Sequence, residues 1–224
     1  MLTSKFRKVE ELRETYCVFA HFYNSEKNRL FADIVRRDCW KEPILPDAYV
    51  VMINPGSCKK NAISEIDASM YPAPYSYQVI EAISDPAMKC VMWLMDSCKL
   101  KKVRILNLVD TVNPKYAALT DELFEKEIAN EYLAKSIFSD VNDEKYRELV
   151  SDDACFFIAW GLDRRFDLLK AQALKKIAPE RIVNISEDGI SYRYIKPMNY
   201  NRQKEISQEY TEQYWKWVEK QKLR

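Results

Sequence analysis

The sequence predicts a single α/β domain in which helices cover both faces of a short, mainly parallel β-sheet. Three runs of β-branched, aromatic and aliphatic residues, at 48–53, 103–109 and 154–160, have the composition of strands buried on both faces. Each run ends in polar residues or glycine and is followed by a segment of helical character. This alternation is typical of a three-layer α/β/α domain with a parallel sheet. A chain of 224 residues can bury a core of this kind without disulfides.

An antiparallel hairpin is expected before the first buried strand. Residues 15–21 and 29–37 are rich in β-forming side chains and flank a polar stretch at 23–28. We therefore expect one domain with three parts, namely a hairpin extension at 1–46, a core at 47–203 and a C-terminal helix at 204–224.

The remaining elements follow from periodicity and from turn residues. Proline is tolerated at the start of a helix, so Pro86 begins a helix that is apolar nearly all round and therefore buried. The expected helices are 77–84, 86–98, 120–138, 144–150, 164–177 and 205–222. Two further short strands are expected at 181–185 and 190–195.

Cysteine and histidine usage argues against several classes of site. The six cysteines form no CxxC pair and several lie in apolar runs, so we expect buried free thiols. The single histidine, His21, lies in a predicted strand, which argues against a histidine metal site or a Ser-His or Cys-His catalytic pair. The sequence has no apolar run long enough to span a bilayer and no signal-peptide core. We therefore expect a soluble cytoplasmic monomer without metal or cofactor.

The net charge of +1 gives no overall argument for a nucleic-acid partner, but charge is unevenly distributed. Residues 121–153 contain eleven acidic and four basic side chains, whereas residues 193–224 contain eight basic and four acidic ones. A polyanion would approach the second surface and avoid the first. The alternative is that both segments are ordinary solvated helix faces.

The first buried strand ends abruptly at Asn54-Pro55-Gly56. Proline removes a backbone donor and glycine can adopt a positive φ, so the strand must stop there. In open α/β sheets, ligands bind at the carboxyl ends of parallel strands. Asn107, Asp110 and Asn113 follow the second buried strand, and Trp160-Gly161 closes the third. Such an amide-rich rim suits hydrogen-bond recognition and the positioning of water; the alternative is that Asn-Pro-Gly is only a turn.

Five segments in this order resemble the uracil-DNA glycosylase superfamily, and within it the mismatch-specific uracil and thymine-DNA glycosylase branch. They are Met-Ile-Asn-Pro-Gly at 52–56, Tyr-Pro-Ala-Pro at 71–74, Leu-Asn-Leu-Val at 106–109, Phe-Ile-Ala-Trp-Gly at 157–161 and Lys-Pro-Met-Asn-Tyr-Asn-Arg at 196–202. A second, compatible resemblance is to an uncharacterised domain family with an N-terminal hairpin ending in Arg and Trp, matched by Arg36 and Trp40, and an Asn-Pro-Ser loop.

The resemblance implies hydrolysis of the N-glycosidic bond of a pyrimidine flipped out of duplex DNA, in repair or in anti-phage defence. Asn54 would position the attacking water, and the backbone N–H groups near Gly56 and Ser57 would stabilise the departing base. Tyr71 would stack on the extruded base and Asn107 would hydrogen-bond its polar edge. The candidate DNA contacts are Lys59, Lys60, Lys196, Met198, Asn199, Tyr200 and Arg202.

Three departures from the family pattern modify these expectations. Lys196 stands where the fast uracil-specific branch carries histidine, which predicts slower chemistry. Met198 replaces a small serine that grips phosphate in the family. The loop between Gly56 and Tyr71 is longer than usual and would make room for a bulky modified pyrimidine.

Two other functional classes remain open at this stage. The domain could bind a nucleotide or a protein on a glycosylase scaffold without cleaving anything, or it could act on free nucleosides. The near-neutral charge favours the binding module slightly, because DNA-binding surfaces are usually more basic.

Overall fold

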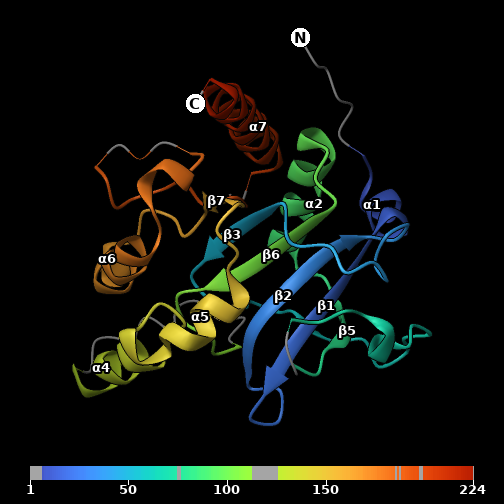
Figure 1. Cartoon of the computed structure of the whole chain (residues 1–224), viewed down its shortest axis with the longest axis horizontal. Coiled ribbons are helices and arrows are strands. Elements are labelled where there is room, and N and C mark those ends of the chain that lie inside the picture. The colour runs from blue at the N-terminus through green and yellow to red at the C-terminus, as the bar shows by residue number, and fades with distance from the viewer. Residues whose placement is uncertain are drawn as a thin grey trace.

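The computed structural model describes residues 7–74, 77–112, 126–184, 186, 188–196 and 199–223, with the backbone alone for 126–129 and 200 (Figure 1). Met198 and residues 113–125, which include predicted rim residue Asn113, lie outside the described residues. Within these ranges seven strands form one mixed sheet in the order β4-β5-β1-β2-β6-β3-β7. They are β1 Tyr16–Tyr23, β2 Asn28–Arg36, β3 Ala48–Met52, β4 Lys59–Lys60, β5 Ile80–Ile83, β6 Lys102–Asn107 and β7 Cys155–Ile158.

The α/β class and the N-terminal hairpin are confirmed. β6, β3 and β7 pair in parallel, whereas the other pairs among the described strands are antiparallel. The expected mainly parallel sheet is therefore confined to these three central strands. The difference arises because the hairpin pairs directly with β6 and extends the sheet instead of standing outside it.

Helices cover both faces of the sheet, as the three-layer prediction requires (Figure 1). On one face lie α1 Val9–Thr15, α2 Pro86–Cys98 and α7 Tyr200–Lys222, and on the other α4 Lys126–Lys135, α5 Asp143–Leu149 and α6 Asp167–Lys176. Four short 3-10 turns complete the described elements, η1 Ala68–Met70, η2 Asp140–Asn142, η3 Arg164–Phe166 and η4 Pro179–Arg181. No helix in the described ranges is long and apolar enough to cross a membrane.

The expected helix at 77–84 is wrong, because residues 80–83 form strand β5. β5 pairs with β1 through Glu81 opposite Phe19, and the buried Glu81 carboxylate accepts hydrogen bonds from the side chains of Asn61 and Ser64. These long-range bonds overrode the local helical preference.

The expected strands at 181–185 and 190–195 appear only as isolated bridges, Phe156 to Ile182 and Gly161 to Tyr192. The side chain of Asn184 accounts for the first case. Its Oδ1 accepts from the Ile158 N–H at 2.8 Å and its Nδ2 donates to the Ile158 carbonyl at 2.7 Å. The amide therefore takes both main-chain groups of Ile158, and main-chain pairing with β7 stops after Val183 N donates to the Phe156 carbonyl at 2.9 Å.

A buried ionic cluster joins the hairpin to the parallel strands. Arg104 on β6 lies opposite Asp33 on β2, and its Nε and Nη2 donate to the two Asp33 carboxylate oxygens at 2.7 and 2.8 Å. Lys102 Nζ lies 3.6 Å from Asp33 Oδ2, and the Tyr71 hydroxyl donates to the same oxygen at 2.6 Å. Asp33 has no exposed surface, and these cationic partners hold its pKa below the usual range against the opposing effect of burial.

Asp33→Asn should therefore be strongly destabilising. It leaves Arg104 and Lys102 buried without a counter-charge, and breaking a buried pair in this way costs about 3–5 kcal/mol. The free energy of unfolding in urea is the measurement. Asp38→Asn is the matched control, because Asp38 pairs with Arg36 at the surface and such pairs contribute less than about 1 kcal/mol. Equal effects of the two substitutions would contradict the role given to Asp33.

Candidate functional site

The carboxyl ends of the three parallel strands meet at one edge of the sheet. β3 runs into Asn54-Pro55-Gly56, β6 ends at Asn107, and β7 leads to Gly161. Hydrogen bonds from Leu108 N to Met52 O and from Val109 N to Ile53 O carry the β3–β6 pairing up to this turn. The structure therefore brings Asn54, Asn107 and Gly161 to a common rim, as the sequence predicted.

Asn107 links the turn to a buried arginine. In the amide orientation that satisfies both neighbours, Asn107 Nδ2 donates to the main-chain carbonyl of Asn54 and its Oδ1 accepts from Arg29 Nη2, each at 3.0 Å. Because a guanidinium can only donate, Arg29 fixes which end of the amide faces Asn54. Asn107 is 3% exposed, so it holds the turn from below and does not present its side chain to a ligand.

A β-bulge aims Arg29 at this position. The β1–β2 register shifts between His21 and Phe22, so that Leu30 and Phe31 both pack against the α4–α6 side of the sheet. Arg29 then points to the opposite face, where it lies beside Asn107 and the Cys58 thiol. Bulges are enriched next to active sites because they redirect a side chain in this manner.

Arg29 is a buried cation with unused donors. It is 1% exposed, and its Nε and Nη1 atoms have no hydrogen-bond partner among the described residues. Burial raises the pKa of the Cys58 thiol although Arg29 acts to lower it, so the thiol stays neutral and does not balance the arginine. The positive charge therefore remains available to the loop that lies above it.

Gly56 and Asp85 bring the turn against the N-terminus of α2. Gly56 has φ +62°, and a Cβ built on it would lie 2.7 Å from Asp85 Oδ2. The other carboxylate oxygen of Asp85 caps α2 by accepting from Met88 N at 2.8 Å. Glycine is required here both by its conformation and by this close approach.

Tyr194 and Lys196 close the other side of the rim. A Cβ on Gly161 would lie 3.5 Å from Tyr194 Cβ, and Tyr194 is 40% exposed. Partial burial, together with the nearby charge of Asp85, raises the pKa of Tyr194 to about 12, so its hydroxyl is protonated at neutral pH. Lys196 lies close enough to Cys90 to oppose the burial that raises the pKa of that thiol to about 12. We call Arg29, Asn54, Gly56, Asp85, Asn107 and Tyr194 the strand-end site.

Asp110 follows Asn107 on the same rim and is half-buried. Burial raises its pKa to about 6, with the cations of Lys135 and Lys145 opposing the shift. Its Oδ1 accepts from Asn28 Nδ2 at 3.1 Å and its main-chain carbonyl accepts from Arg29 N at 2.8 Å. Asp110 therefore ties the start of β2 to the end of β6.

Tyr71 lies away from the rim. It is 4% exposed, its ring stacks on Phe19 with 4.2 Å between ring centroids, and Lys102 Nζ lies 4.9 Å from its centroid. Lys102 begins β6 whereas Asn107 ends it. The predicted stacking of Tyr71 on an extruded base therefore needs correction, because in this structure the ring is part of the core around Asp33.

The predicted DNA contacts are scattered. Lys59 and Lys60 form edge strand β4 and pair with β5, which leads them away from the turn. Ser57, which was predicted to contact the base, is exposed beside the turn. Asn199 caps α7 by accepting from the N–H groups of Asn201 and Arg202. Arg202 is exposed and pairs with Glu205 at 2.7 Å. Met198 and the side chain of Tyr200 lie outside the described residues.

Sequence reasoning missed Arg29, Asp85 and Tyr194. Asp85-Pro86 at the start of a helix is a recognisable cap signal and could have placed Asp85 at the rim. Tyr194 lies within the strand expected at 190–195, and this pattern gave it no role at the rim. Arg29 gave no signal, because its direction depends on a bulge that only the folded hairpin reveals.

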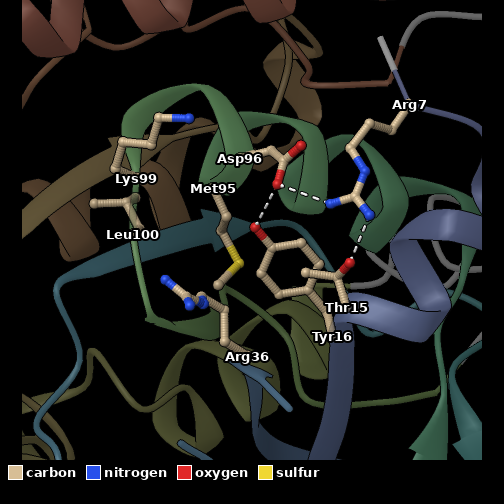
Figure 2. Close-up of a pocket in the computed structure, with 8 residues that line it drawn as sticks. All are labelled: Arg7, Thr15, Tyr16, Arg36, Met95, Asp96, Lys99 and Leu100. Carbon is tan, nitrogen blue, oxygen red and sulfur yellow. Dashed lines mark hydrogen bonds and ion pairs between the residues drawn. The ribbon is translucent and has the colours of Figure 1, made fainter. Parts of the chain in front are cut away.

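A second group of charged residues lies at the other end of α2 and is drawn in Figure 2. Arg7 Nη1 donates to Asp96 at 3.3 Å, the Tyr16 hydroxyl donates to the same carboxylate at 3.1 Å, and Arg7 Nη2 donates to Thr15 at 2.7 Å (Figure 2). These bonds fasten the N-terminal segment and β1 to α2. They border a cavity of about 250 Å³.

No family model, curated protein or solved structure matches this chain. Within the described ranges, no group of three or more His, Cys, Asp or Glu residues could hold a metal ion.

Gly56→Ala should destabilise the protein by about 2 kcal/mol or more, because the positive φ costs roughly 1–2 kcal/mol for a residue with a Cβ and the methyl group must displace Asp85. Urea unfolding measures the change. Gly189→Ala is the matched control, since Gly189 has φ +79° with no atom within 4 Å of its Cβ position. The difference between the two variants isolates the contact with Asp85, and a difference of zero would show that the contact is unimportant.

Proposed function

We propose that this protein is a DNA glycosylase that hydrolyses the N-glycosidic bond of a pyrimidine flipped out of duplex DNA, in the cytoplasm and without a cofactor. The observation that carries the proposal is the anchoring of the Asn54 main chain by Asn107 and Arg29 at the carboxyl end of β3. Ligands of open α/β sheets bind at this end. The site is rich in amides and backbone donors, and this favours a reaction that needs water to be held and charge to be accepted.

In this proposal Asn54 holds the attacking water. Cleavage of an N-glycosidic bond leaves a sugar with oxocarbenium character, so the nucleophile needs correct placement more than strong activation. The side-chain carbonyl of Asn54 would accept a hydrogen bond from that water. Placement on a rigid turn can contribute several kcal/mol to lowering the barrier.

The departing base carries negative charge, and three features of the site would stabilise it. The N–H groups near Gly56 and Ser57 would donate to the base, and each such donor is typically worth about 3–4 kcal/mol. The N-terminus of α2 lies beside Gly56 and adds a favourable dipole, which the Asp85 cap partly offsets. The buried charge of Arg29 lies below the turn, where the low dielectric increases its effect.

With Tyr71 in the core, Tyr194 is the aromatic residue that best suits stacking on the base. Its exposure and its position next to Gly161 and Asp85 support this role. Lys196, Asn199 and Arg202 follow it in sequence and would contact the DNA backbone. The basic segment at 193–224 would then face the polyanion.

Asn54→Ala should abolish base excision and leave thermal stability nearly unchanged, because Asn107 holds the main chain of Asn54 and this bond survives the substitution. Asn54→Asp is the conservative variant and should retain activity, because it keeps an oxygen that can accept from water and adds a general base. The assay measures alkali-labile abasic sites in DNA containing uracil, mismatched thymine or modified cytosines.

The result also separates the proposal from its main rival, a nucleotide-binding or protein-interaction module on the same scaffold. Cleavage of one of these DNAs by the wild type, lost in Asn54→Ala, supports the glycosylase. Full activity in Asn54→Ala would remove Asn54 from the mechanism. Binding of DNA without cleavage of any of the substrates would favour the module.

A further inference from the structure

A cavity with stiff walls and a charged floor lies at the amino ends of β3 and β6. Its volume is about 370 Å³, within the range of small-molecule sites. Pro43, Pro46, Pro72 and Pro74 contribute to its walls, and Lys102 and Arg104 lie at its floor. We call it the proline-walled pocket. It lies at the opposite end of β6 from Asn107 and shares no residue with the strand-end site.

The floor carries one uncompensated positive charge. The side chains of Lys102 and Arg104 are 3% and 4% exposed, and Asp33 is the one carboxylate within ion-pair distance of either cation among the described residues. Burial and the Asp33 carboxylate raise the pKa of Tyr71 far above its usual value, so Tyr71 is neutral and adds no negative charge. Two cations therefore share a single anion in the floor. Glu148 also lines the pocket, but its carboxylate accepts from the Tyr77 hydroxyl at 2.9 Å and, among the described ion pairs, pairs with neither cation.

Apart from Asp33, the groups that contact these two cations are electrically neutral. Lys102 Nζ donates to the Ile44 carbonyl at 3.0 Å and Arg104 Nη1 donates to the Leu149 carbonyl at 2.8 Å. The Tyr71 ring faces Lys102 and the Phe31 ring faces Arg104, at 4.9 and 4.8 Å. These dipoles and rings solvate the cations without neutralising them, and a buried excess charge remains costly. Burial accordingly lowers the pKa of Lys102.

The pocket of Figure 2 shows the contrast. There Arg7 pairs with Asp96 (Figure 2), and Arg36 pairs with Asp38, a residue outside the cavity lining. The third cation of that lining, Lys99, is exposed to solvent. The cations of that cavity are therefore either paired with a carboxylate or open to solvent, so none is a buried cation that lacks a counter-ion.

We propose that the proline-walled pocket binds a small organic anion, with a carboxylate at Lys102 and Arg104 and an apolar body between the prolines. Arg104 spends three of its five N–H groups on Asp33 and Leu149, which leaves donors for a ligand carboxylate. Prolines and Val150 offer an apolar surface to the body of the ligand. The negative charge of the ligand would balance the excess positive charge of the floor. The pocket would therefore select its ligand by both charge and shape.

Benzoate is the probe, and benzamide is its neutral counterpart of the same shape. Titration of each into the full chain, followed by amide chemical shifts, should show benzoate binding at least tenfold more tightly than benzamide. Acetate, which lacks the apolar body, should bind at least tenfold more weakly than benzoate. Equal affinity for benzoate and benzamide would overturn the proposal, and equal affinity for acetate and benzoate would overturn the part assigned to the proline walls.

Lys102→Met tests whether the excess positive charge causes the preference for benzoate over benzamide. It leaves Asp33 and Arg104 as a one-to-one pair, so the variant should melt no lower than the wild type while its affinity for benzoate falls at least tenfold. Unchanged affinity would show that the excess charge does not attract the ligand. A large loss of stability would show that Lys102 is a structural partner of Asp33 and not an excess cation.

A pair of variants at an exposed residue of the pocket lining tests the proposal without disturbing the buried ionic cluster. Leu45 lines the pocket and is 68% exposed. Leu45→Glu places a carboxylate where it repels or competes with the ligand, and Leu45→Gln is the uncharged control of the same size. Benzoate should bind severalfold more weakly to the Glu variant than to the Gln variant, and equal affinities would contradict binding in this pocket. Asn54→Ala should bind benzoate like the wild type, so this inference stands or falls apart from the glycosylase proposal.

Discussion

The amide of Asn107 is the contact on which the architecture of the strand-end site depends. It receives a hydrogen bond from Arg29, next to the turn of the hairpin, and gives one to the main chain of Asn54 at the end of β3. Three segments distant in sequence therefore meet at one side chain. Because Arg29 can only donate, only one orientation of the Asn107 amide satisfies both neighbours. The amide in this orientation then holds the turn that carries Asn54 in place. The bulge in the hairpin contributes to this link between Arg29, Asn107 and Asn54, because it directs Arg29 to this face of the sheet.

Buried cations lie near each end of strand β6, and they differ in the partners that surround them. At its start, Lys102 and Arg104 share Asp33 and border the proline-walled pocket. At its finish, Arg29 lies under the Asn54 turn with two unused donor atoms among the described residues. A structural protein core avoids such charges unless they are paired. Both proposals rest on this feature: the cations at the start of β6 would bind an organic anion, and Arg29 at its end would stabilise a leaving base.

Local patterns predicted much of the fold and the edge at which the site lies. Pro86 and the apolar run that follows were enough to give α2 its observed bounds, and the turn residues of the hairpin were enough to give its pairing. Sequence failed where a distant partner decided the outcome. Residues 80–83 became a strand through β1, and Asn184 used its side chain in place of a strand backbone. Tyr71 looked like a loop aromatic but is held in the core by Asp33 and Phe19, while Arg29 acquired its role only from the bulge.

A double-mutant cycle between Arg29 and Asn107 tests the central contact most directly. The free energies of unfolding of Arg29→Met, Asn107→Leu and the double variant would be measured in urea. If the amide joins Arg29 to the Asn54 turn, removing Asn107 alone leaves a further unpaired buried guanidinium atom, and the double variant is less destabilised than the sum of the single ones by about 1–3 kcal/mol. Strictly additive effects would contradict the account, because they would mean that Arg29 does not hold Asn107 and that the turn is positioned by something else.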